Sequence, residues 1–315
     1  MFIRLGYVGN PITFGKDTYC KTMTLTTYRK LKDKAYFKLD QIIRNNLDML
    51  LKVLKYNVQN NIKFYRMSQN IVPLATIIDD DFDYINPYLD KWQRIGNYIK
   101  KHNLRVDMHP DQFCVLNSIN DQVIKNSIKE LSYHVKIYQA MGLDSKLVLH
   151  VGGATLGKID AKKRFIITFL SLPDELKSSI ILENDDKIFT LEDTLSLCEK
   201  LHIPFVLDYL HYLCNNTKEK LDNYWERICK TWEGTGLNPK IHFSCSKSKR
   251  EKRSHSDYIK YSDFKKFLNK IVKFNCDIDI MLECKSKDEA LLRLERQLKL
   301  DGYKIRHGIL ELNNK

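Results

Sequence analysis

Histidine and acidic residues stand at the ends of several short apolar segments of this 315-residue chain. The segments are rich in β-branched and aromatic residues, as strands buried on both faces are, and longer segments with helical spacing separate them. If the strands form a parallel barrel, their carboxyl ends meet at one rim, where barrel active sites are built. The strand ends carry His109, His150, Glu183, Asp208 with His211 three residues later, His242 and Glu283.

This set of side chains predicts a metal centre. A single histidine or acidic residue at a strand end usually has only a structural role, as a hydrogen-bonded group or a helix N-cap. Many partly buried titratable groups at one rim are hard to explain without metal ions. Imidazole nitrogens with bridging carboxylates suit Zn²⁺ or Mn²⁺ better than Ca²⁺ or Mg²⁺. The number of ligands exceeds one site, so we expect two or three ions, a cluster able to promote phosphate ester hydrolysis.

Lys240 precedes His242 by two residues, so the two side chains face the same side of a strand. Two interpretations are open. A lysine buried beside metal ligands needs a phosphate, a carboxylate or a chemical modification to compensate its charge. Alternatively, Lys240 is only the first, solvated residue of its strand.

The motif HPDQF (109–113) follows the third strand-like segment, and its proline predicts a turn. Gln112 and Phe113 then belong to a loop above the site. An exposed aromatic ring beside a polar amide could insert into a base stack. The alternative is that Phe113 caps the core of the barrel.

The balance of charge favours an anionic partner. The chain has 52 Lys and Arg against 39 Asp and Glu, a formal net charge of +13, which indicates nucleic acid first and an anionic membrane surface second. The basic segment 247–253 (KSKREKR) follows the seventh strand-like segment, so its Lys247, Lys249 and Arg250 are candidates for phosphate contact. The long first loop is also basic, with Lys16, Lys21, Arg29, Lys30, Lys32 and Lys34.

Eight strand-like segments alternate with eight helical ones. The strands are expected at 2–8, 62–67, 104–109, 146–151, 179–184, 203–208, 240–245 and 278–283, and the helices at 39–54, 88–101, 121–141, 160–171, 190–201, 219–232, 257–272 and 287–298. This alternation predicts an α/β fold, a (β/α)₈ TIM barrel, as a single domain over 1–315 with a C-terminal tail at 299–315; a doubly wound sheet is the alternative. Long loops are expected at 9–36 and 244–256, and helix N-caps at Asp121 and at Thr190, which Asp193 follows.

The eight cysteines contain no C-x-x-C pair, so a structural zinc ribbon is not expected. No segment has 18 uninterrupted apolar residues, and the first residues do not have the pattern of a signal peptide. We therefore expect reduced thiols, mostly in the core, in a cytoplasmic protein that does not span a membrane.

Taken together, the motifs resemble those of the ultraviolet damage endonuclease family. The resemblance extends over about residues 1–298, and its motifs occur in the family's order: IRLGY (3–7), FYRMSQNIVPLAT (64–76), HPDQF (109–113), LHVGG (149–153), LEND (182–185), LDYLH (207–211), KIHFS (240–244) and MLECKSKDEALLRL (281–294). It implies a single TIM barrel with three divalent ions, commonly manganese, with zinc or magnesium as alternatives. It also implies incision of damaged double-stranded DNA immediately 5′ to cyclobutane pyrimidine dimers, 6-4 photoproducts and some abasic sites, with no obligate protein partner.

The resemblance assigns roles to individual residues. Glu183, Lys240 and Glu283 match catalytic positions; Glu183 is the bridging carboxylate, and Lys240 matches a lysine that can be carboxylated. Gln112 and Phe113 match the pair that probes the damaged duplex, and Tyr7 and Asn10 match residues near the lesion. The implied metal ligands are His109, His150, Glu183, Asp208, His211, His242, His255 and Glu283.

One ligand of the family is missing. The family has a histidine after a P-[LF]-A-[ST] stretch, whereas here P-L-A-T (73–76) is followed by Ile77, which offers no lone pair. We expect a water molecule to complete the shell of the ion held by His109, His150 and Glu183.

Two other classes of protein remain open. A sugar isomerase or epimerase on a similar barrel also uses His, Glu and Asp around divalent ions, but it needs neither the net charge of +13 nor the HPDQF motif. A DNA-binding barrel that has lost a metal ion is the non-enzymatic alternative. Metal-dependent nicking of irradiated plasmid would separate the endonuclease from both.

Overall fold

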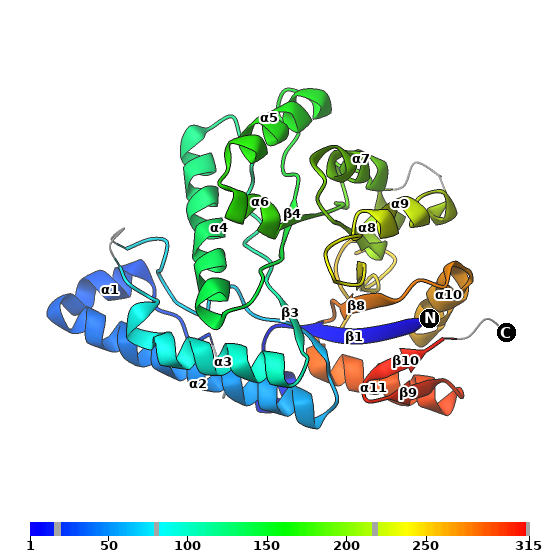
Figure 1. Cartoon of the computed structure of the whole chain (residues 1–315), viewed down its shortest axis with the longest axis horizontal. Coiled ribbons are helices and arrows are strands. Elements are labelled where there is room, and N and C mark those ends of the chain that lie inside the picture. The colour runs from blue at the N-terminus through cyan, green and yellow to red at the C-terminus, as the bar shows by residue number, and fades with distance from the viewer. Residues whose placement is uncertain (16–19, 79–81, 216–219, 313–315) are drawn as a thin grey trace.

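Eight short parallel strands form the centre of the molecule (Figure 1), a computed structural model that describes residues 1–15, 20–78, 82–215 and 220–312. Their spatial order is β3-β2-β1-β8-β7-β6-β5-β4, so β1 and β8 pair and bring the two ends of the chain together. The strands are β1 (Phe2–Val8), β2 (Phe64–Arg66), β3 (Arg105–Asp107), β4 (Leu147–His150), β5 (Ile180–Glu183), β6 (Phe205–Asp208), β7 (Lys240–Phe243) and β8 (Ile278–Leu282). This confirms the predicted TIM barrel and rules out the doubly wound sheet.

The barrel is nearly closed. Within the described residues, β3 and β4 share only an isolated bridge between Met108 and Leu147, where the Val148 amide donates to the Met108 carbonyl at 3.3 Å. The strands are short and buried on both faces, as β8 illustrates with every residue buried. Helices cover the outer face and side chains fill the interior, which explains the apolar runs in the sequence.

Helices surround the barrel, and each predicted helix has a counterpart. They are α2 (Ala35–Gln59), α3 (Leu89–Lys101), α4 (Asp121–Met141), α5 (Lys158–Ser171), α7 (Leu191–Leu201), α9 (Trp225–Lys230), α10 (Tyr261–Ile271) and α11 (Lys287–Leu300), with α6 (Asp174–Ser179) and α8 (Tyr209–Cys214) as short additions. The helix expected at 219–232 is reduced to the short α9, and residue 219 lies outside the described residues.

Two details of the prediction need correction, and a third is confirmed. The expected loop at 9–36 contains a helix, α1 (Leu25–Leu31), which the Thr24 side chain caps by accepting from the Thr27 amide. The N-cap of α4 is Asn120 and not Asp121, since the Asn120 side chain accepts from the Gln122 amide. Thr190 caps α7 as predicted, in a capping box with Asp193.

The residues after α11 add a hairpin, β9 (Lys304–Arg306) and β10 (Ile309–Glu311), to the region expected as a tail. β10 pairs antiparallel with the first residues of β1, and the two strands lie side by side in Figure 1. Gly308 in the turn has a φ of 77°, and a Cβ there would lie 1.7 Å from the Asn61 carbonyl oxygen, so the turn requires glycine.

Ion pairs occupy part of the barrel interior, where aliphatic layers are usual. In the lowest layer, Asp279 accepts from both Arg4 and Arg105 at 2.5 Å. Lys240, the register partner of Asp279, forms a second buried ion pair with Asp107. Asp107 and Lys240 precede His109 and His242 by two residues, so this second pair lies below the carboxyl ends of β3 and β7.

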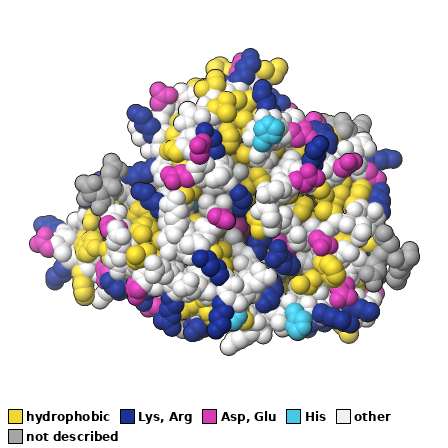
Figure 2. Space-filling model, viewed as in Figure 1, with side chains coloured by type: hydrophobic (Ala, Val, Ile, Leu, Met, Phe, Trp, Pro, Cys, Tyr) yellow, Lys and Arg dark blue, Asp and Glu magenta, His cyan; other side chains and the backbone are white. Residues whose placement is uncertain are grey.

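Positive side chains are spread over the face of the molecule that Figure 2 shows. Figure 2 shows Lys and Arg side chains along the lower edge of the visible face and between acidic groups elsewhere. The net charge therefore does not locate a binding face by itself. None of the described helices has the length and apolarity needed to cross a bilayer.

Candidate metal centre and its rim

A cavity of about 470 Å³ opens at the carboxyl ends of the strands. His109 follows β3, His150 ends β4 and Glu183 ends β5, so consecutive strands deliver three of its lining side chains. His211, His255 and Glu283 also line it, together with Arg66 and Asp111. Asp208 and His242 are fully buried beneath them. The structure thus brings together all eight residues expected as metal ligands.

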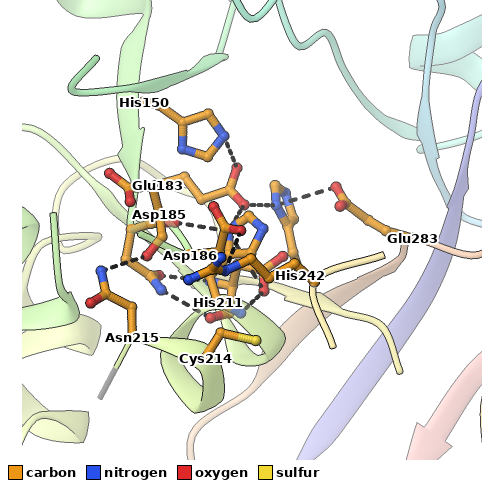
Figure 3. A network of polar contacts seen from close by, with 12 residues as sticks. His150, Glu183, Asp185, Asp186, His211, Cys214, Asn215, His242 and Glu283 are labelled. Atoms are coloured by element: carbon orange, nitrogen blue, oxygen red, sulfur yellow. Dashed lines mark hydrogen bonds and ion pairs between the residues drawn. The ribbon is translucent and has the colours of Figure 1, made fainter. Parts of the chain in front are cut away.

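Glu183 is the centre of this cluster. Its Oε2 lies 3.4 Å from His109 Nε2 and 3.8 Å from His150 Nε2. Its Oε1 lies 3.1 Å from His242 Nδ1 and 3.5 Å from His211 Nδ1. Figure 3 shows His150 and His242 pointing toward the two oxygens of this one carboxylate. The two oxygens therefore face two different pairs of imidazoles, as a bridging carboxylate would.

Glu283 forms the second half of the cluster. Its Oε1 lies 3.4 Å from His242 Nδ1, and its Oε2 lies 3.9 Å from His255 Nε2. His255 comes from the segment after β7, where an isolated bridge with Ser246 holds it over the site. His242 Nδ1 thus faces both carboxylates, which makes it the ring nitrogen placed to bind an ion.

Local structure explains the D-x-x-H spacing. Asp208 is the N-cap of α8, and its Oδ1 accepts from the His211 amide at 2.7 Å. The first turn of α8 therefore returns the His211 ring to the strand end. Asn184 fixes this arrangement: its side chain bonds both backbone groups of Asp208, and its carbonyl lies 3.0 Å from His211 Nδ1.

The donor set fits divalent ions of the kind that imidazole and carboxylate ligands bind. Two groups have ligand atoms within 4.8 Å of one another, His109 with His150 and Glu183, and Glu183 with Asp208 and His242. Glu183 Oε2, Asp208 Oδ2 and His242 Nδ1 are buried and have no hydrogen-bond partner among the described residues. Buried polar atoms are costly without a partner, so these atoms indicate ligand positions.

Burial and charge shift the proton affinities of the cluster in opposite directions. Burial lowers the pKa of His150 and of His242, although the charge of Glu183 opposes this shift. Burial opposes the charge on His211, but Asp208 and Glu183 outweigh it and raise its pKa to about 9. Burial likewise opposes the negative charge of Glu183, yet His242 and His150 hold its pKa well below the usual range.

Lys240 is completely buried, so the solvated alternative is wrong. Its ammonium pairs with Asp107, which is also buried. Burial lowers the pKa of Lys240 to about 8, and the charge of Asp107 opposes this shift. Of the partners considered from the sequence, the structure supplies a carboxylate.

The loop after His109 is exposed above the cavity. Gln112 lines the cavity, and Phe113 is 76% exposed, so the core-capping alternative for Phe113 is wrong. Asn10 is half-buried and follows Gly9, which also lines the cavity. Tyr7 is different: its ring is fully buried and its hydroxyl donates to Asn57 Oδ1 at 2.7 Å, so it cannot contact DNA directly.

The two basic segments differ in how their charges are used. Lys247 pairs with Glu251 at 3.0 Å, whereas Lys249 and Arg250 are exposed and have no ion pair among the described residues. The first loop has five exposed cations that also have no ion pair in the described part of the chain: Lys21, Arg29, Lys30, Lys32 and Lys34. Lys16 lies outside the described residues.

Ile77 does not line the cavity. Its side chain is 60% exposed and borders a separate groove of about 440 Å³, together with Asp111 and Phe113. The side chain of residue 77 is therefore outside the cluster, and only three described side chains, His109, His150 and Glu183, converge on this part of the site.

Two residues of the site were missed from the sequence. Arg66 ends β2, and its guanidinium lies 2.5 Å from both Glu283 Oε1 and His242 Nε2. Asp107 precedes His109 by two residues and pairs with Lys240. The strand-end argument covered only imidazoles and carboxylates, which excluded Arg66; the two-residue spacing used for Lys240 would have found Asp107.

The fold and the cluster define a class of protein, a TIM barrel that gathers histidine and carboxylate side chains able to hold metal ions at its carboxyl rim. The model of the UV-endonuclease UvdE family matches residues 3–311, and the chain belongs to this family. The UV DNA damage endonuclease of Bacillus cereus (strain B4264) is 42% identical over 301 residues, which cover 95% of each chain. The UV DNA damage endonuclease of Bacillus thuringiensis subsp. konkukian (strain 97-27) is 40% identical over 301 residues, again 95% of each chain.

Solved structures agree with the fold. The crystal structure of SacUVDE matches with a TM-score of 0.85 and 31% identity, covering 95% of this chain and 98% of that one. Endonuclease IV from Thermus thermophilus matches with a TM-score of 0.58 at 9% identity, over 94% and 99% of the two chains. D-psicose 3-epimerase from Clostridium cellulolyticum matches with a TM-score of 0.52 at 8% identity, and the match covers 89% of this chain and 85% of that one. At such low identity the last two share the fold alone, and the family membership disfavours the isomerase alternative.

Proposed function

We propose that this DNA repair endonuclease hydrolyses the phosphodiester bond immediately 5′ to ultraviolet lesions, with cyclobutane dimers and 6-4 photoproducts as substrates and abasic sites as further ones. The observation that carries the proposal is the position of Glu183, whose two oxygens face four imidazoles from different elements of the rim at 3.1–3.8 Å. Such a cluster suits the hydrolysis of a phosphate ester, because several cations can neutralise the charge that develops on its oxygens.

The proposed metal ligands form two sites joined by Glu183, with a third on the side of Glu283. His109 and His150 serve the first, and Asp208 and His242 the second. His211, His255 and Glu283 line the same cavity and would hold a third ion. When bound, manganese ions would supply an activated water and charge stabilisation for the phosphate.

The chain's own residues around the cluster have separate tasks. Arg66 orients Glu283 and His242 by contacting both. Lys240 and Asp107 place a buried ion pair below the ligands and keep solvent from that side. Whether Lys240 carries a carboxylate modification can be decided by the carbamate ¹³C signal of the intact protein after exposure to ¹³C-bicarbonate, and its pairing with Asp107 supports the unmodified ammonium.

Lesion recognition is proposed to depend on the reduced cost of unstacking damaged bases. Gln112 and Phe113 are exposed on the loop beside the cavity, where they could fill the gap left by an extruded dimer. Phe113→Ala should then weaken binding to lesion duplex more than to undamaged duplex. If Phe113→Ala weakened binding to both duplexes equally, Phe113 would have no part in recognising the lesion.

The test is a duplex with one cyclobutane dimer at a defined position and a label on the damaged strand. With Mn²⁺ present we expect one cut directly 5′ to the dimer, and no cut in the undamaged duplex. Glu183→Gln, which keeps the shape of the side chain, should abolish incision. Glu175→Gln on the exposed surface of α6 is the matched control and should cut normally. Incision by Glu183→Gln at the normal rate would reject the cluster as the active site.

A further inference from the structure

Cys229 and Cys276 lie in contact, although 47 positions separate them in the chain. Cys229 belongs to α9, and Cys276 lies just before β8. Their sulfur atoms are 3.1 Å apart, and both thiols are free. A disulfide has an S–S bond of about 2.05 Å, so a movement of about 1 Å would join them.

Neighbouring contacts hold the two thiols in this position. The Trp225 ring of α9 stacks on Phe274, with centroids 4.9 Å apart and an interplanar angle of 10°. An ion pair between Asp222 and Lys273 fastens the same two segments on another side. The proximity of the sulfurs is therefore set by the packing of these segments.

The pair is also chemically distinct from the other cysteines. Cys114, Cys198, Cys245 and Cys284 are buried, whereas Cys229 and Cys276, like Cys20 and Cys214, are half-buried and within reach of small molecules. The Cys229 thiol donates to Cys276 Sγ, and this hydrogen bond lowers the pKa of Cys276. A thiolate is the attacking species in thiol–disulfide exchange, so Cys276 is the expected nucleophile.

We propose that Cys229 and Cys276 are a modification site, a dithiol that a small-molecule disulfide converts reversibly into an intramolecular disulfide. The sulfur of Cys276 attacks the small disulfide, forms a mixed disulfide and releases one small thiol. The sulfur of Cys229 then attacks Cys276, and the second small thiol leaves. Two protein thiols are oxidised, one small disulfide is reduced, and the two released thiols carry the two protons.

The disulfide would close a loop that contains residues of the candidate site. The closed loop runs from 229 to 276 and contains β7 with Lys240 and His242. Closing a loop of this length restricts the unfolded chain more than the folded one, which stabilises the fold. The sequence, with its scattered cysteines, predicted only reduced thiols; the structure adds that two of them are prepared for oxidation.

The test uses the reduced, full-length protein and oxidised glutathione as the small disulfide. After alkylation of the remaining thiols and digestion, we expect a peptide that links Cys229 to Cys276, lighter by two hydrogen atoms and lost on reduction. The variants Cys229→Ser and Cys276→Ser should each lack it, and Cys214→Ser, another half-buried cysteine, should retain it. The oxidised protein should melt higher than the reduced one by roughly 5 °C.

Two outcomes would overturn the inference. One is the absence of the linked peptide while both thiols remain alkylated, which would show that the backbone cannot close the bond. The other is an oxidised protein that melts below the reduced one, because a preformed geometry should not strain the fold. Neither readout depends on DNA incision, so this inference and the proposed function can fail separately.

Discussion

Arg66 is positioned to hold two of the proposed metal ligands. Its contacts of 2.5 Å with Glu283 and His242 are made by a side chain that is almost entirely buried. Residues that orient metal ligands commonly contribute about 10–100-fold to metal affinity or activity. We expect Arg66→Met to weaken Mn²⁺ binding by about this factor, measured by calorimetric titration. Arg44→Met, on the exposed face of α2, is the control and should bind Mn²⁺ normally.

The protonation of His211 makes metal binding depend on pH. Its pKa is raised to about 9 in the free site, so it carries a proton at pH 7 that an ion must displace. The apparent metal affinity should therefore rise by up to about tenfold per pH unit between pH 7 and pH 9 and level off above. Titrations at several pH values check this, and a flat response across that range would contradict it.

The same shift has the opposite sign for the stability of the metal-free protein. A histidine whose pKa is raised on folding stabilises the fold fully below its unfolded value of 6.5 and loses that contribution as pH rises through about 9. Alkaline pH should therefore favour metal binding while it weakens the metal-free fold. Urea unfolding of chelator-treated protein at pH 6 and pH 9 measures the second effect.

At the scale of elements, the β9–β10 turn depends on a glycine for two reasons. Gly308 and Gly302 both have positive φ, 77° and 86°, but only Gly308 has a backbone oxygen where a Cβ would lie. Gly302→Ala should cost about 1 kcal/mol from backbone strain alone. Gly308→Ala should cost at least about 2 kcal/mol more, because β10 must move away from Asn61. Urea unfolding of both variants compares them, and equal losses would show that the turn relaxes freely.

Most elements could be predicted because their causes are local. The apolar runs marked each of the eight barrel strands, and T-x-x-D marked the start of α7 through a capping box that forms as expected. The helix α1 was missed because it is only seven residues long, and its apolar residues, Leu25, Tyr28 and Leu31, are only partly buried. The hairpin after α11 was missed because its short strands are stabilised by β1, a partner distant in sequence.

The candidate site was predictable only where each residue could be assigned to a strand end. That argument gave His109, His150 and Glu183 their places, since parallel strands end at one rim. Packing across the barrel decides the rest. Tyr7 stands at the end of β1, but its ring turns into the core and bonds Asn57 of α2, and no spacing rule in the sequence reveals that orientation.

At the scale of the whole molecule, DNA binding should depend on salt. Each phosphate neutralised by a basic side chain contributes about −0.9 to the slope of log K against log salt. Lys249→Ala and Arg250→Ala should each make the slope shallower by up to this amount, since neither residue has an ion pair among the described residues. Lys247→Ala should change it less, because Lys247 already pairs with Glu251. If all three variants changed the slope equally, the ion pair with Glu251 would not limit the contact of Lys247 with phosphate.

The nearly open junction between β3 and β4 has a consequence for motion. Only the Met108–Leu147 bridge joins these strands within the described residues, and the next residues on each side include His109 and His150. An ion bound by both histidines would cross-link the barrel at the junction between β3 and β4, where the backbone pairing is weakest. Amide hydrogens of β3 and β4 should therefore exchange with solvent rapidly in chelator-treated protein and slow markedly when Mn²⁺ is added. The amides of β7 and β8, whose pairing is continuous, should change far less.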